Sequence, residues 1–212
     1  MGIGVLIIGK SGSGKSASLR NFKKEDVGII NVISKPLPFE NKNGLKTVDT
    51  DNYADVYALL EKSKAKSIVI DDAGYLISNQ FMRQHSNVGG GNAVYNLYND
   101  LADNYWQITE KIKALPQDKI VYIIMHTEKN EFGDIKPKTI GKLLDDKVCV
   151  EGLFAIVLRS KKVDNNYYFF TQSTENDVAK SPMGMFNDLF IDNDLKAVDD
   201  RIREFYKIKG EN

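Results

Sequence analysis

The residues best suited to chemistry lie near the N-terminus, where glycines, a lysine and a serine follow the spacing G-x-x-x-x-G-K-[ST]. They are Gly9-Lys10-Ser11-Gly12-Ser13-Gly14-Lys15-Ser16. Glycines let backbone N–H groups converge on phosphate oxygens, so the pattern predicts a phosphate-binding loop that extends to Ala17. Lys15 is expected to reach the β- and γ-phosphates of a nucleotide and to act in catalysis, while Ser16 offers its hydroxyl to Mg²⁺. A glycine-rich turn without a ligand is the alternative, which the flanking strand and helix patterns disfavour.

Two carboxylates form the second candidate cluster. Asp71 and Asp72 follow residues 67–70, a short run rich in β-branched side chains that predicts a buried strand. A carboxylate at the end of such a strand can orient the waters of Mg²⁺ beside a serine hydroxyl, which gives Asp71 the metal role. Asp72 points the other way along the strand and is predicted to position the attacking water. A capping carboxylate without a chemical role is the alternative.

Two further side chains follow predicted strands. His126 comes directly after the apolar run 120–125, and it could sense a γ-phosphate by hydrogen bonding or simply be satisfied at the strand end. Glu40 follows the proline-rich stretch 34–38 and is a reserve candidate for the catalytic acid, because ligands collect at the strand ends of open α/β sheets. A solvated loop carboxylate is the alternative for Glu40.

These side chains can meet only if a parallel sheet brings the strand ends to one edge. Buried strands are predicted over 3–8, 27–33, 67–70 and 120–125. Helices are predicted over 17–22, 53–62 and 95–115. Residues 150–159 and 167–172 predict an antiparallel hairpin. The pattern indicates an α/β fold with a mostly parallel central sheet, flanking helices and an antiparallel hairpin at one edge. A final helix over about 193–208 is expected to pack on this core or on a neighbouring subunit.

Two long segments without clear periodicity are predicted to be binding loops. Residues 78–93 contain three consecutive glycines and are expected to be mobile, and residues 127–145 follow the predicted strand 120–125. The basic residues of the two segments are Arg83, Lys129, Lys136, Lys138 and Lys142. Solvated charged connections are the alternative interpretation.

The composition gives the chain no overall charge that would attract a particular class of partner. Of 212 residues, 29 are Lys or Arg and 29 are Asp or Glu, so no global positive field indicates a nucleic-acid partner and any such contact must be local. The length suits one domain over 1–212. No apolar run approaches the roughly 18 residues that span a bilayer, so no membrane partner is expected. The lone Cys149, and a phosphate loop where a signal peptide would lie, favour the cytoplasm.

The order of these parts resembles the RecA-like P-loop ATPases over most of the chain. Three short stretches look like small phage-encoded single-strand annealing ATPases (Sak type, AAA-like ATP-binding proteins), namely 35–39 (KPLPF), 125–128 (MHTE) and 179–182 (AKSP). The resemblance implies ATP and Mg²⁺ as cofactors, assembly into a ring or filament, and single-stranded DNA held by residues 78–93 and 127–145. It also suggests Lys180 as a positive finger that reaches a neighbouring subunit's γ-phosphate, with a surface lysine as the alternative.

One departure from the RecA pattern affects the catalytic assignment. No glutamate stands clearly where RecA proteins carry their catalytic acid, which leaves Glu40 and Asp72 as substitutes. The sequence predicts a Mg²⁺-dependent ATPase of phage recombination or replication that acts on single-stranded DNA in the host cytoplasm, with a single-strand binding protein as a further candidate partner. Two other functions stay open: a small-molecule phosphotransferase of the P-loop class, and a nucleotide-gated assembly or loader protein with negligible turnover.

Overall fold

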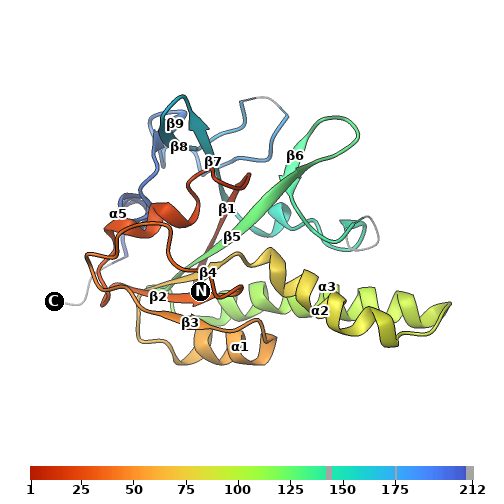
Figure 1. Cartoon of the computed structure of the whole chain (residues 1–212). Coiled ribbons are helices and arrows are strands. Elements are labelled where there is room, and N and C mark those ends of the chain that lie inside the picture. The colour runs from red at the N-terminus through yellow and green to blue at the C-terminus, as the bar shows by residue number, and fades with distance from the viewer. Residues whose placement is uncertain (142–144, 175, 209–212) are drawn as a thin grey trace.

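The computed structural model describes residues 1–141, 145–174 and 176–208 (Figure 1). Within these residues, nine strands form a mixed sheet in the order β3-β2-β4-β5-β1-β7-β8-β9, with β6 paired to β5. The strands are β1 (Ile3–Gly9), β2 (Val27–Asn31), β3 (Thr47–Asp49), β4 (Ser67–Asp71), β5 (Ile120–Lys129), β6 (Ile135–Pro137), β7 (Ile156–Val163), β8 (Asn166–Phe170) and β9 (Phe190–Asp192). Pairing is parallel from β3 to β7 and antiparallel through β7, β8 and β9. The predicted α/β fold with an antiparallel hairpin at one edge is confirmed.

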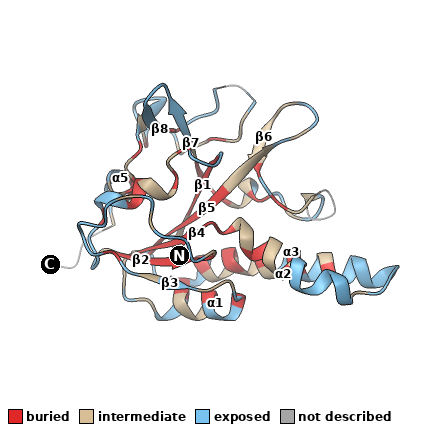
Figure 2. Cartoon of the chain, in the orientation of Figure 1, coloured by how far each residue is buried: buried red, intermediate tan, exposed pale blue. Residues whose placement is uncertain are grey.

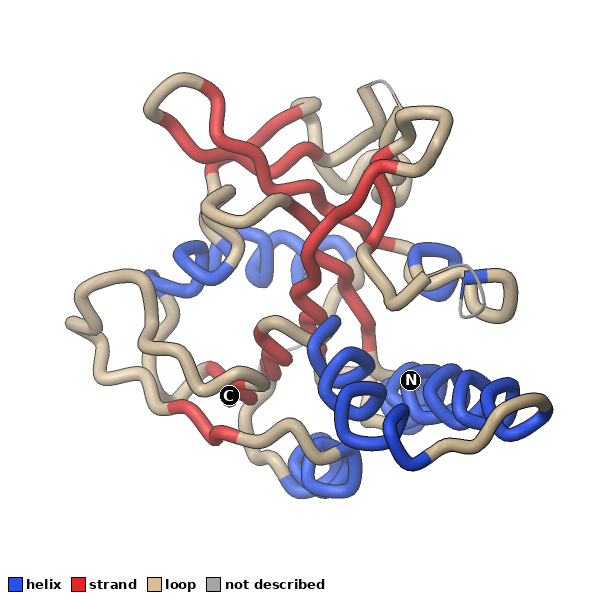
Figure 3. The backbone as a smooth tube through the Cα atoms, turned by 45° about the vertical axis from the view of Figure 1, so that its right-hand side comes forward, coloured by secondary structure: helices blue, strands red, loops and turns tan. Residues whose placement is uncertain are grey.

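Helices cover both faces of the parallel strands (Figure 3). One face is covered by α1 (Tyr53–Lys62), α2 (Gly74–Gln84) and α3 (Asn92–Ala114), and the other by the 3-10 helix η1 (Ser16–Asn21) and α5 (Leu195–Phe205). β1 shows the result: Leu6 and Ile8 belong to one apolar cluster, and Val5 and Ile7 to the other. Strands buried on both faces read as continuous apolar runs, which is why the sequence reveals them. Among the described residues, no helix combines the length and apolar character needed to cross a membrane.

The helix expected over residues 17–22 is present as a 3-10 helix that begins one residue earlier. The chain makes the six-residue 3-10 helix η1 and leaves it at Phe22, whose backbone is extended. Tertiary contacts hold this short form, because Arg20 Nη1 donates to the Asn193 carbonyl oxygen (2.5 Å) and Asn21 Nδ2 donates to the Asp194 carboxylate (2.7 Å). Packing and side-chain contacts outweigh local helix propensity here.

The mobile loop expected over 78–93 is wrong, because most of that segment is helical. α2 continues to Gln84 with Leu76 and Ile77 fully buried, and Phe81 packs against Tyr98 of α3 with ring centroids 5.8 Å apart. The 3-10 helix η2 (His85–Asn87) follows, and the glycines make only the turn into α3. α2 and α3 thus form a helical hairpin whose far end is exposed (Figure 2).

Residues 127–145 also differ from the prediction of a loop. β5 continues to Lys129 and pairs with β6, and the turn between them is held by Asn130 Oδ1, which accepts the N–H groups of Phe132 (3.0 Å) and Asp134 (2.8 Å). The predicted hairpin strand 150–159 begins later, at Ile156, because residues 151–153 form the 3-10 helix η3 (Glu151–Leu153). The short edge strands β3 and β9 were not predicted.

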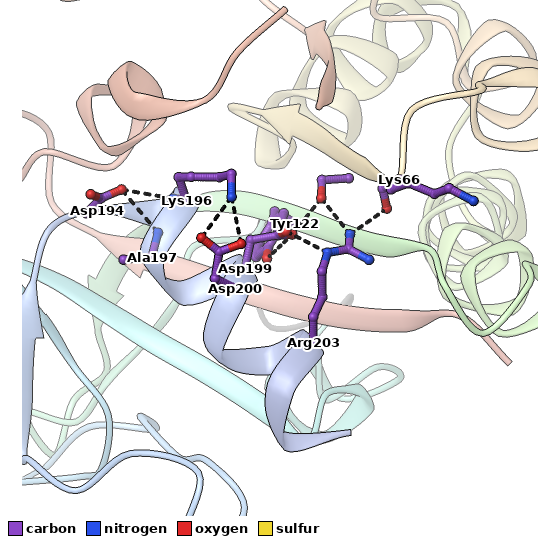
Figure 4. A network of polar contacts seen from close by, with 9 residues as sticks. Lys66, Tyr122, Asp194, Lys196, Ala197, Asp199, Asp200 and Arg203 are labelled. Carbon is purple, nitrogen blue, oxygen red and sulfur yellow. Dashed lines mark hydrogen bonds and ion pairs between the residues drawn. The ribbon is translucent and has the colours of Figure 1, made fainter. Parts of the chain in front are cut away.

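The helix α5 packs on the chain's own sheet. Its carboxylate Asp199, 3% exposed, accepts hydrogen bonds from Ser67 Oγ of β4 (2.5 Å), Tyr122 Oη of β5 (2.8 Å) and Arg203 Nε (2.7 Å) (Figure 4). Arg203 also donates to the Lys66 carbonyl oxygen (3.1 Å). These bonds fasten α5 to the ends of β4 and β5 that lie opposite the phosphate loop.

Candidate functional site

The phosphate loop, residues 9–16, follows β1 and lies between the ends of two neighbouring strands. Gly9 stands opposite His126 of β5, and β7 flanks β1 on the other side. A Cβ on Gly9 would lie 2.4 Å from Ser13 Oγ and 2.6 Å from the Ser160 carbonyl oxygen, so only glycine permits this fold of the loop. Ser160 Oγ donates to the Ser13 carbonyl oxygen (2.6 Å), which ties the loop to β7.

Backbone N–H groups of the loop stay available for an anion. Among the described residues, no acceptor receives the N–H groups of Gly12, Gly14, Lys15, Ser16 or Ala17. Gly12 and Gly14 have φ angles of 73° and 95°, which glycine adopts without strain. Successive unpaired N–H groups in such a loop form a concavity that binds anions. Because η1 has only six residues, the loop amides, and not a long helix dipole, supply the positive potential.

Lys15 is 5% exposed, and its ammonium group lies on the loop's own carbonyl oxygens. Nζ donates to Gly9 (3.0 Å) and to Lys10 (2.9 Å), and it lies 3.4 Å from His126 Nδ1. Burial lowers the pKa of Lys15 to about 8, although the charges of Asp72 and Asp71 act in the opposite direction. A desolvated cation beside unpaired amides favours a multiply charged anion such as a triphosphate.

Ser16 and Asp71 meet directly. Ser16 Oγ donates to Asp71 Oδ1 (2.9 Å), and the backbone N–H of Asp72 donates to the same oxygen (3.1 Å). Burial and the neighbouring charge of Asp72 raise the pKa of Asp71 to about 6. Within the described residues, no group of three or more His, Cys, Asp or Glu side chains could hold a metal by itself. One hydroxyl and one carboxylate fit Mg²⁺, which commonly takes few protein ligands and completes its shell with water and phosphate oxygens.

Asp72 turns away from Asp71 and toward His126. Its φ of 57° is left-handed, a conformation that aspartate tolerates better than most residues, and it marks the turn from β4 into α2. His126 Nε2 lies 3.3 Å from Asp72 Oδ1, and Lys35 Nζ lies 3.7 Å from Oδ2. With the ring proton on Nε2, His126 accepts from Lys15 and donates to Asp72, which makes one polar chain. Burial opposes the ionised form, but the His126 hydrogen bond and the nearby positive charges lower the pKa of Asp72.

These groups line one open cleft of about 390 Å³, within the size range of small-molecule sites. Its other walls come from residues 35–38 and from Tyr167 of β8. Tyr167 was not among the predicted site residues. Its ring lies against the phosphate loop, because a Cβ on Gly14 would be 2.8 Å from Tyr167 Cδ1. In the sequence, the predicted hairpin was the feature that indicated a return of the chain toward the phosphate loop, but it did not single out Tyr167.

A protein-family model described as an AAA domain matches residues 1–183. The chain belongs to this AAA domain family. The match makes the chain a nucleotide-binding protein of the P-loop ATPase type, and it includes the phosphate loop, both carboxylates and His126. The helix α5 lies outside the matched part of this AAA domain. No curated protein matches the chain.

Three of the predicted catalytic residues come together in one cleft of the AAA domain, and two do not line that cleft. Lys15, Asp72 and His126 share the cleft. Glu40 does not line the cleft, and its exposed carboxylate lies 3.1 Å from Lys42. Lys180 also lies outside the cleft lining, where its backbone exchanges two hydrogen bonds with Val157 of β7 (2.8 and 2.9 Å).

Two of the basic residues predicted to bind DNA are held in ion pairs. Arg83 is bonded to Asp51 (2.6 Å), and Lys136 pairs with Asp145 and with Glu128 (3.5 Å). Lys129 and Lys138 are exposed and have no carboxylate partner among the described residues. Lys142 lies outside the described residues.

Proposed function

We propose that this AAA domain binds ATP with Mg²⁺ and hydrolyses it, and that it acts on single-stranded DNA. The observation that carries the nucleotide proposal is the 2.9 Å contact of Ser16 Oγ with Asp71 beside Lys15 and Asp72 in one cleft. The hydroxyl and the carboxylate would hold Mg²⁺, which when bound neutralises charge on the phosphate oxygens. The unpaired loop amides would receive the phosphates themselves.

Asp72 is the proposed group that positions the attacking water. Its carboxylate is ionised, lines the cleft and is oriented by His126, as a general base requires. Lys15 would exchange the carbonyl oxygens of Gly9 and Lys10 for phosphate oxygens, which are stronger acceptors because they are charged. His126 touches both Lys15 and Asp72, so a change at the terminal phosphate would reach the base through one imidazole.

Tyr167 is proposed to contact the nucleoside part of ATP. The ring is 40% exposed and forms a wall of the cleft on the side of β8. An aromatic ring of this kind can stack on any nucleobase, because stacking does not read the hydrogen-bond donors and acceptors of the base edge. ATP and GTP carry the same triphosphate, so a preference for one of them would need contacts to the base edge beyond this ring, and competition between ATP and GTP for the wild-type cleft measures it.

A phosphotransferase is the second candidate, because a separate hollow of about 310 Å³ adjoins the site. Ser11, Lys35, Tyr75 and His126 are among its lining residues, so a small second substrate there would lie near the terminal phosphate. A nucleotide-gated loader with negligible turnover is the third. Release of phosphate to water, transfer to an added acceptor, or tight ATP binding without product distinguishes the three.

Self-association into a ring or filament remains a proposal that rests on the RecA-like order of elements. In such an assembly Lys180 would act in a neighbour's site, since it does not line the cleft of its own chain. Mixed subunits test it: Lys180→Ala combined with Lys15→Ala should regain turnover if sites form between subunits. No recovery in subunits shown to exchange would overturn the role of Lys180.

The deciding experiment measures ATP turnover with and without single-stranded DNA while the oligomeric state is followed in the same samples. Lys15→Ala should keep its melting temperature and lose about 30- to 100-fold in ATP affinity, as for a lost charged hydrogen bond. Lys23→Ala, an exposed lysine just beyond η1, is the matched control and should bind ATP like the wild type. Unchanged ATP affinity in a folded Lys15→Ala protein would sink the nucleotide assignment.

A further inference from the structure

The antiparallel edge of the sheet carries aromatic rings on one face. Tyr168 of β8 and Phe190 of β9 meet edge to face with centroids 5.7 Å apart, and Phe170 lies at the same centroid distance from Phe190. Phe190 is 52% exposed although it belongs to a strand, and Tyr168 is half-buried. Lys161 Nζ lies over the Phe170 ring at 5.4 Å. We call Tyr168, Phe170 and Phe190 the aromatic face.

A basic hollow of about 410 Å³ lies beside this face, between the end of β5, the phosphate loop and β7. Four exposed lysines line it: Lys10, Lys129, Lys161 and Lys162. None of the four has a carboxylate partner among the described residues. Arg159 also lines the hollow but pairs with the buried Asp177 (2.6 Å). We call this hollow the lysine groove.

The groove and the aromatic face are continuous. In the pairing of β7 with β8, Lys161 stands opposite Tyr168 and Arg159 stands opposite Phe170, so the lysine that lines the groove also borders the rings. Some lysines elsewhere in the described chain, such as Lys111 and Lys196, are instead held by carboxylates. Four lysines without carboxylate partners among the described residues therefore lie next to the aromatic face, whose Phe190 ring is exposed, in a chain with no net charge.

We propose that the lysine groove and the aromatic face form the path of a single-stranded polynucleotide. This rests on the proposed action on DNA and gives it a location that keeps Lys129 of the predicted segment 127–145 and adds residues of the phosphate loop and β7. Unpaired lysines attract backbone phosphates, and exposed rings stack on bases. Duplex DNA hides its bases from such rings, and an acidic peptide has no flat groups for them, so the combination favours a single strand.

The phosphate loop separates the groove from the nucleotide cleft. Ser11 and Gly12 line both hollows, so a strand in the groove would touch the loop from the side away from the nucleotide. A strand bound in the groove would restrict the motion of the phosphate loop before ATP binds. ATP binding would then cost less conformational entropy, so each ligand favours the binding of the other. The expected result is ATP turnover that rises when single-stranded DNA is present.

The test is fluorescence anisotropy with a labelled oligothymidylate of about 20 nucleotides, longer than single-strand sites commonly are. Lys129→Ala with Lys161→Ala should weaken binding and reduce the magnitude of the log–log salt slope by about 1.4, or about 0.7 for each lost phosphate contact. Phe190→Ala should weaken binding by about 5- to 100-fold without changing that slope, since it removes stacking and no charge. Phe190→Leu, which keeps an apolar side chain, should weaken binding as well.

Lys23→Ala with Lys24→Ala, which removes two exposed lysines outside the groove, is the matched control and should bind like the wild type, and melting temperatures confirm that each variant is folded. Loss of binding in this control alone would overturn the path while leaving a DNA-acting ATPase intact. Wild-type ATP turnover without any oligonucleotide binding would remove both the path and the action on DNA. Equal binding of a duplex, or equal competition by polyglutamate, would also overturn the proposal, because either ligand needs only the charge.

Discussion

The two ends of β4 carry buried polar groups with opposite properties. At one end, Ser67 donates to Asp199, whose carboxylate has three donors, one of which is the Arg203 guanidinium. At the other end, Asp71 is 7% exposed and accepts from Ser16 Oγ and the Asp72 backbone N–H, but it is next to a second negative charge and lines an open cleft. The five-residue strand β4 thus contacts the carboxylate of Asp199, which has a full set of donors, at one end, and at the other end carries the carboxylate of Asp71 next to a like charge.

This difference shows how burial alone fails to mark a functional carboxylate. A buried charge with its full set of donors and a cation contributes to the fold, because removing a partner leaves the other charge uncompensated. A buried carboxylate next to another negative charge is disfavoured in its ionised form, and the binding of a cation stabilises that form. A neighbouring like charge together with an accessible cleft distinguishes Asp71 from Asp199.

Asp72→Asn should give the largest effect at the cleft end. The amide cannot accept a proton, so turnover should fall by about 10²- to 10⁴-fold while ATP still binds. Single-turnover hydrolysis with enzyme in excess measures the chemical step. Glu40→Gln is the matched control, because Glu40 is exposed and paired with Lys42. A normal rate for Asp72→Asn together with loss in Glu40→Gln would reverse the assignment of the base.

Asp199→Asn should give the largest effect at the opposite end. It leaves the Arg203 guanidinium without its carboxylate, and the free energy of unfolding should fall by about 2 to 3 kcal/mol. The melting temperature should drop by about 5 to 10 °C, with ATP affinity of the folded protein unchanged. Asp200→Asn is the matched control: its carboxylate is exposed and pairs with Lys196 (2.6 Å), so less than about 0.5 kcal/mol is expected. Equal shifts in the two variants would contradict a role for burial.

Asp71→Asn should have a smaller effect of the opposite sign. The folded-state pKa of Asp71, about 6, exceeds the ordinary value of 3.8, so the folded state holds the proton more tightly and loses stability as pH rises from about 4 to about 6. Asparagine does not titrate. Without nucleotide and metal, the variant should exceed the wild type by about 1 to 3 kcal/mol in free energy of unfolding at about pH 8, and match it near pH 4.

Urea unfolding at several pH values measures that gain. Adding Mg²⁺ with ATP should reverse the order at about pH 8, since only the carboxylate can hold the cation. If Asp71→Asn instead lowers the free energy of unfolding at about pH 8, the Asp71 carboxylate stabilises the fold as Asp199 is expected to do.

The strands were predictable from the sequence because burial on both faces leaves continuous apolar runs. β1, β4 and β5 lie where those runs predict them, and the loop after β1 follows from its glycine spacing. The order of strands was not predictable from local patterns. β5 lies between β1 and β4, and only this order brings His126 between Lys15 and Asp72.

Two errors have a common cause in tertiary contacts. The polar residues of 78–93 obscured the continuation of α2, which packs against α3. Residues 127–129 were assigned to a loop, although they pair with β6. Tyr167 was missed because its place beside Gly14 depends on where the hairpin of β7 and β8 returns. Local periodicity carries no information about such distant partners.

The contacts that hold the phosphate loop also set an order in time. Ser160 bonds to the Ser13 carbonyl oxygen from 147 positions later, and Asn193 and Asp194 bond to η1 from 173 positions later. A chain leaves the ribosome N-terminus first, at about 5 to 20 residues per second, and distant pairs form only after the intervening chain exists. The loop is therefore among the first parts to be synthesised and among the last to be held in shape, and nascent chains pass several seconds with its glycines unsupported.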